Sequence, residues 1–139
     1  MKNLVFGVNQ VKYPQKGKKP GLDLGLVAIW NEYGTRLAPP RPAFRMGLES
    51  SIKKNEKLIQ AQLKNITQRI LTGRSAEIDK SLTVLLTQIG RTAKKETQDI
   101  IKMGSTTANA PSTVKRKGFN HPLVETELLL KNVAYEVTE

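Results

Sequence analysis

The chain has 139 residues, of which 38% are apolar and 5% aromatic, and its formal net charge is +11 at pH 7. This length suits a single domain, residues 1–139, with a modest core built mainly from Leu, Ile and Val. The absence of cysteine excludes disulfides and thiolate metal sites, and the single histidine, His121, argues against a histidine zinc cluster or a Ser-His-Asp triad.

The first predicted element is a strand within residues 3–13, "NLVFGVNQVKY". The apolar run at the start is too short for a signal peptide or a membrane span, so we expect a protein made in the cytoplasm. Residues 14–21, "PQKGKKPG", hold two prolines, two glycines and three lysines, which predicts an exposed, mobile basic loop.

Residues 22–33 have two interpretations, a strand followed by a loop, or a short helix from about Leu26 to Tyr33. We favour the helix, closed by Gly34 in a left-handed cap. Trp30 and Tyr33 are expected to pack under the turn that follows. Three prolines stiffen the path into the next helix: Pro39, Pro40 and Pro42.

Arg41 stands between two of these prolines. Its guanidinium is expected to donate hydrogen bonds to carbonyls or to a carboxylate, for which Glu32 is the candidate. The alternative left open is that Arg41 lies in solvent.

Two long amphipathic helices are predicted next, over about 43–72 and 75–103. Apolar residues recur at three- and four-residue steps along both. Gly73 and Gly104 are the expected stops, and Ser75 the expected cap of the second helix. Only a few residues join the two helices, which predicts an antiparallel hairpin. Each apolar stripe is wide enough to need a further partner, either a sheet or another subunit.

A loop over 104–113 and a strand over about 132–138, "NVAYEV", complete the pattern. The predicted fold class is therefore α+β. It consists of a long antiparallel helical hairpin packed with a small antiparallel sheet from the N- and C-terminal strands.

No pattern of residues points to catalysis. There is no glycine-rich phosphate loop, and no nucleophile with an adjacent base. Glu125 and Glu127 near His121 could suggest a metal or acid/base site, but a His-Pro turn with solvated glutamates is the simpler interpretation. Glu32 alone is weak support for a general base. We therefore predict no enzyme activity, no metal and no cofactor.

Basic residues gather in two predicted loops, and these are candidate contacts to DNA or to a partner: Lys16, Lys18 and Lys19, then Lys115, Arg116 and Lys117. No aromatic residues interleave with them, so a nonspecific phosphate contact is the most they indicate. A small basic nucleic-acid-binding protein is the alternative to the function considered next.

Three blocks in order carry a family resemblance. They comprise Trp30, Asn31, Glu32, Tyr33, Gly34 and Thr35, then Arg41, Pro42 and Phe44, then Gly118, Pro122, Leu123 and Thr126. This order resembles the neck or tail-completion proteins of long-tailed double-stranded DNA phages, also called virion morphogenesis or head–tail connector proteins. Two departures stand out, because Glu127 replaces the usual glycine after Thr126, and Pro40 replaces the usual alanine before Arg41.

The resemblance implies a non-enzymatic virion protein at the head–tail junction or in the tail, assembled in the host cytoplasm. It implies a homo-oligomeric ring, a hexamer or dodecamer, that contacts other connector, head-closure, tail-terminator or tail-tube proteins. Phage DNA in the channel is a further implied partner, and no membrane is involved. A ring would also explain the modest core, because subunits would share burial.

Overall fold

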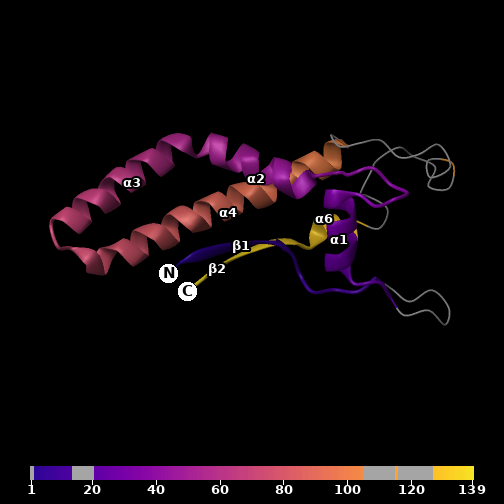
Figure 1. Cartoon of the computed structure of the whole chain (residues 1–139), viewed down its shortest axis with the longest axis horizontal. Coiled ribbons are helices and arrows are strands. Elements are labelled where there is room, and N and C mark those ends of the chain that lie inside the picture. Colours follow the sequence, from indigo (N-terminus) through magenta and orange to yellow (C-terminus); the bar gives the residue numbers. More distant parts are fainter. Residues whose placement is uncertain (1, 14–20, 105–114, 116–126) are drawn as a thin grey trace.

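The computed structural model describes residues 2–13, 21–104, 115 and 127–139. In chain order the elements are β1 (Asn3–Val8), α1 (Leu24–Tyr33), α2 (Ala43–Lys54), α3 (Glu56–Leu71), a 3-10 turn (Ser75–Glu77), α4 (Ile78–Met103), α6 (Leu128–Lys131) and β2 (Val133–Thr138). The predicted α+β class is confirmed, because α4 packs against a two-stranded antiparallel sheet made from both ends of the chain (Figure 1).

The sheet turns one apolar face toward the helices. Three cross-strand pairs lie on that face: Leu4 with Val137, Phe6 with Tyr135, and Val8 with Val133. The sheet and α4 approach closely at Gly90, where an added Cβ would lie 2.4 Å from the Tyr135 ring. Alternation leaves the opposite face, with Val5 and Glu136, open to solvent.

β1 is shorter than the strand predicted over residues 3–13. It ends at Val8, which pairs with Val133, the first residue of β2. The Asn9 amide still donates to the Asn132 carbonyl at 2.9 Å, but Asn132 is the residue that follows α6. No further residue of β2 therefore remains for β1 to pair with. The pairing partner, and not the apolar pattern of β1, sets the length of the strand.

The residues that flank the predicted basic loop pair with each other. Lys12 and Asp23 form an antiparallel bridge, and the Tyr13 amide donates to the Leu22 carbonyl at 2.8 Å. These contacts bring the two flanks of the predicted loop side by side. Of the predicted loop 14–21, only Gly21 belongs to the described residues.

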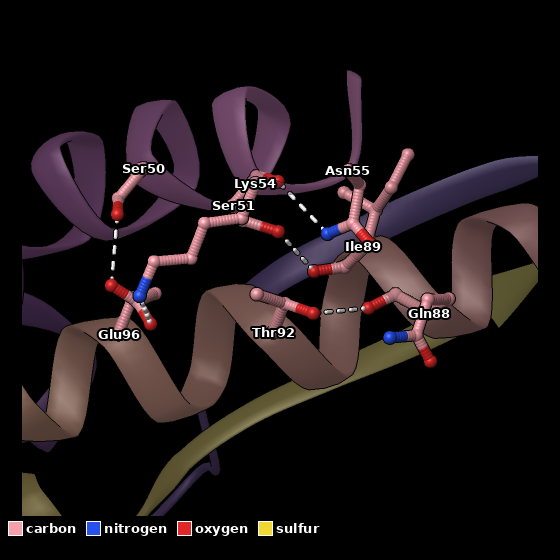
Figure 2. Close-up of polar contacts among 8 residues, drawn as sticks. All are labelled: Ser50, Ser51, Lys54, Asn55, Gln88, Ile89, Thr92 and Glu96. Carbon is pink, nitrogen blue, oxygen red and sulfur yellow. Dashed lines mark hydrogen bonds and ion pairs between the residues drawn. The ribbon is translucent and has the colours of Figure 1, made fainter. Parts of the chain in front are cut away.

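The helix predicted over 43–72 is two helices, α2 and α3, which meet at a bend at Asn55 (Figure 1). The backbone of Asn55 has φ −99° and ψ 9°. Its side-chain Nδ2 donates to the Ser51 carbonyl at 2.9 Å, the same oxygen that accepts the Asn55 amide at 3.0 Å (Figure 2). An asparagine side chain that competes for a helical carbonyl in this way favours an interruption of the helix.

Glycines end the helices where the sequence placed the stops. Gly73 has φ 71°, and the Gly73 and Arg74 amides donate back to the Ile70 and Arg69 carbonyls, which is the Schellman arrangement. Gly104 closes α4 with φ 64° and ψ 27°. The second long helix begins later than residue 75, because the 3-10 turn Ser75–Glu77 precedes α4.

Small residues bring α2 and α4 together. Ala43, Gly47 and Ser51, spaced four residues apart along α2, are all buried. The Ser51 hydroxyl donates to the Ile89 carbonyl of α4 at 2.7 Å (Figure 2). A stripe of small side chains allows the two backbones to approach, and a hydroxyl can then reach a carbonyl of the neighbouring helix.

The hydrophobic core lies at the end of the helical hairpin where the termini of several elements meet. Six buried residues form it: Leu24, Ala28, Ala43, Ile101, Leu129 and Val133. Phe6 and Phe44 pack beside this core with ring centroids 5.7 Å apart. By contrast, α3 has no buried residue, so the far end of the hairpin is held by few tertiary contacts.

Candidate functional site

The candidate functional site is the outer surface of α1 together with the turn that follows it. The Asp23 carboxylate caps α1 by accepting the Gly25 and Leu26 amides at 2.8 and 3.2 Å. Leu24 and Ala28 turn inward to the core. The rest of the helix carries a second apolar set that remains exposed, so α1 is apolar on both sides.

We call this exposed apolar set the α1 surface. Its six large side chains come from α1 and from the residues just before and after it: Leu22, Leu26, Ile29, Trp30, Tyr33 and Leu37. Tyr33 is 78% exposed and Trp30 is 41% exposed. The prediction that these two aromatics pack under the turn is therefore wrong. The inward side of α1 is taken by smaller residues at Leu24 and Ala28, which leaves the aromatics on the outside.

The turn after α1 is tight and specific. Gly34 has φ 78° and ψ 177°, so it is not in the left-handed helical cap that the sequence predicted. An added Cβ there would lie 2.8 Å from the Pro40 nitrogen, a contact that favours glycine as strongly as its φ does. The Thr35 hydroxyl accepts the Leu37 and Ala38 amides at 3.2 and 3.1 Å, which holds Leu37 outward.

Glu32 links α1 to the start of α2. Its two carboxylate oxygens accept the Phe44 and Arg45 amides at 3.1 and 2.9 Å. The residue before α2 is Pro42, which offers no side-chain cap. Glu32 therefore satisfies the free amides of Phe44 and Arg45, which lie twelve and thirteen residues further along the chain. The sequence named Glu32 as a candidate carboxylate for Arg41; the structure gives the Glu32 carboxylate two backbone donors.

Arg41 and Asn31 complete the link between these elements. The Arg41 amide donates to the Asn31 carbonyl at 2.5 Å, and Asn31 Nδ2 donates to the Val27 carbonyl at 2.8 Å. Arg41 is half-buried, and this burial lowers the pKa of its guanidinium. The first two motif blocks are thus brought together as one folded unit that fixes α1 against α2.

A second exposed apolar set lies at the far end of the hairpin. We call it the hairpin-tip surface, and its members are Leu63, Ile70, Leu71 and Val84. A hollow of about 430 Å³ opens beside it between α3 and α4, with Leu58 and Arg91 in its lining. The Arg69–Glu77 ion pair ties α3 to the turn that precedes α4.

Several predicted residues fall outside the described part of the chain. These are Lys16, Lys18, Lys19, Arg116, Lys117, Gly118, Pro122, Leu123 and Thr126, together with His121. Lys115 is described and exposed, and its backbone is helical, which differs from the loop predicted there. The third motif block is therefore not placed relative to the first two.

The described residues contain no group of three His, Asp or Glu side chains that could hold a metal ion. None of the helices in the described ranges combines the length and apolar composition needed to cross a bilayer. Comparisons with protein-family models, with curated proteins and with solved structures returned no match.

Two features of the site escaped the sequence reasoning. The apolar residues Leu26, Ile29 and Leu37 were not singled out, although Leu26, Ile29 and Tyr33 recur at helical spacing on one side of α1. The small residues at positions 43, 47 and 51 also recur every four residues. That spacing is the sequence pattern that could have predicted a close helix crossing.

Proposed function

We propose that this protein is a structural virion protein at the head–tail junction of a long-tailed double-stranded DNA phage. In this proposal, copies of the chain assemble as a ring of six or twelve that joins or completes the tail. The resemblance of the three motif blocks supports the proposal. The ring would contact connector, head-closure, tail-terminator or tail-tube proteins, without enzymatic activity.

The observation that carries the proposal is the placement of two exposed apolar surfaces at opposite ends of the molecule. Figure 1 shows α1 at one end of the helical hairpin and the α3–α4 turn at the other. The α1 surface belongs to the first of these ends and the hairpin-tip surface to the second. Exposed apolar patches of this kind mark sites of protein contact. Two different patches on one chain suit head-to-tail contacts, which close into a ring when the rotation between copies allows it.

The test is the mass of the purified protein in solution, measured by light scattering after size exclusion, and its incorporation into particles. The variant Ile29→Ser with Tyr33→Ser should lower the oligomer mass and the amount of protein in particles. The control variant Val5→Ser with Ile52→Ser removes the same number of exposed apolar side chains outside both surfaces. A wild-type chain that stays monomeric and never enters particles would overturn the proposal.

A second candidate function is the binding of nucleic acid. The net charge of +11 favours it, since such an excess attracts polyanions. It predicts an affinity for DNA that falls steeply with salt. The two candidates are compatible, because a ring around the channel would have DNA as a neighbour.

A further inference from the structure

One face of α4 carries all five basic residues of that helix. At about 100° per residue, five side chains fall within a sector of roughly 100°. We call them the α4 basic stripe: Lys80, Arg91, Lys94, Lys95 and Lys102. The sequence analysis assigned no role to the basic residues of this helix.

The acidic residues of α4 lie outside this sector. Asp79, Glu96 and Asp99 fall on other sides of the helix, by the same spacing. Glu96 is occupied by Lys54 and by the Ser50 hydroxyl, at 2.5 and 2.8 Å (Figure 2). Within α4 the stripe therefore carries one sign of charge, with Asp99 at one edge. Glu77, from the turn before α4, lines the same hollow as Lys80.

The cations of the stripe are available to a ligand. Four of them are exposed, and Lys94 is half-buried. Within the described part of the chain, none of the five forms an ion pair. A polyanion could therefore bind these five side chains without breaking an ion pair within the described part of the chain.

The shape of the stripe suits a duplex. From Lys80 to Lys102 it runs about 33 Å along a straight helix, at about 1.5 Å per residue, which is close to one turn of B-form DNA. No aromatic residue occurs in α4 to stack on unpaired bases. Basic side chains without aromatic neighbours are suited to phosphates, which position a protein on DNA without reading its sequence.

We propose that the α4 basic stripe binds the phosphate backbone of double-stranded DNA. The inference deepens the second candidate function by naming its surface. It assigns the contact to a rigid helix, whereas the sequence alone pointed to Lys115–Lys117 and the loop 14–21.

The test compares three triple variants, each of which replaces three cations with glutamine and so lowers the net charge equally. The stripe variant changes Arg91, Lys95 and Lys102. The first control changes the outer side of α2 and α3, at Lys53, Lys57 and Lys64. The second control changes Lys115, Arg116 and Lys117.

Fluorescence anisotropy with a labelled 30-base-pair duplex would give the affinity of each protein between 50 and 200 mM salt, with circular dichroism to check folding. Each lost phosphate contact should reduce the slope of log affinity against log salt by about 0.9. The stripe variant should therefore lose about 2.7 from the slope, which makes the fall in affinity over this range about fortyfold smaller. The two controls should retain the wild-type slope.

Four results would overturn the inference. Equal losses in all three variants would indicate a general effect of charge, and a loss confined to the second control would move the contact to Lys115–Lys117. Displacement of the duplex by an equal charge of polyglutamate would indicate an acidic protein as the partner. A wild-type protein that does not bind the duplex would end both this inference and the second candidate function, and would leave the ring proposal standing.

Discussion

Gly47 of α2 and Thr97 of α4 are in direct contact where the two helices cross. A Cβ added to Gly47 would lie 1.9 Å from Thr97 Oγ1 and 2.9 Å from the Thr97 amide nitrogen. Thr97 is fully buried, so it has no room to move aside. This contact sets how closely α2 approaches α4, and through α2 it also sets the position of α1.

Gly47→Ala is therefore expected to destabilise the fold. Overpacking at the crossing should lower the free energy of unfolding by about 1–3 kcal/mol, even though alanine is the better helix former by about 1 kcal/mol. Urea denaturation followed by circular dichroism measures the change. Gly7→Ala is the matched control, because its Cβ would enter open space and should leave stability unchanged or slightly raised. Equal stability of Gly47→Ala and wild type would contradict the tight crossing.

Glu32→Ala removes the carboxylate that accepts the Phe44 and Arg45 amides in the first turn of α2. Loss of a helix cap costs about 0.5–2 kcal/mol, so the free energy of unfolding should fall by that amount. Glu32→Gln keeps an acceptor oxygen and should lose less. Glu136→Ala, at an exposed position on the sheet, serves as the control in the same urea titration. If all three variants unfold at the wild-type midpoint, Glu32 is not a cap.

Glu96 is expected to make stability depend on pH. The hydrogen bond from Lys54, and then that from Ser50, hold the pKa of Glu96 below its ordinary value of 4.5. A carboxylate whose pKa is lowered by folding contributes stability above its unfolded pKa, and loses it as the pH falls through the lowered folded pKa. Lys54 is largely exposed, so the contribution at pH 7 should be only about 0.2–1 kcal/mol.

The measurement is the difference in free energy of unfolding between wild type and Glu96→Gln from pH 7 to pH 3. This difference should be constant above about pH 4.5, and should vanish at lower pH. Lys54→Gln should reproduce part of the loss at pH 7. A difference that does not change with pH would show that the charge of Glu96 contributes nothing to stability.

Hydrogen exchange should distinguish the two ends of the hairpin. Amides in α3 should exchange faster than those in the second half of α4, because α3 has no buried residue whereas α4 buries Ala93, Thr97 and Ile101. Exchange followed by mass spectrometry on peptides from 56–71 and 89–101 makes the comparison. Equal protection in both peptides would mean that α3 is held by contacts absent from this structure.

Much of the fold could be predicted because the responsible interactions are local. Gly73 and Gly104 end their helices through their own backbone conformations, with φ of 71° and 64°. The alternation at Val133, Tyr135 and Val137 similarly predicted β2 from side-chain periodicity. The candidate site was harder, because the motif residues were recognisable while the direction in which Trp30 and Tyr33 face was not.

The sequence by itself determined that helices end at Gly73 and Gly104, and that amphipathic helices accompany strands from the two ends of the chain. Only the tertiary structure decided that Glu32 caps a helix that begins eleven residues later, and that Gly47 meets Thr97. The physical reason is distance along the chain. A turn or a helix end is set by neighbouring residues, whereas a helix crossing depends on which small residues of one element meet those of another.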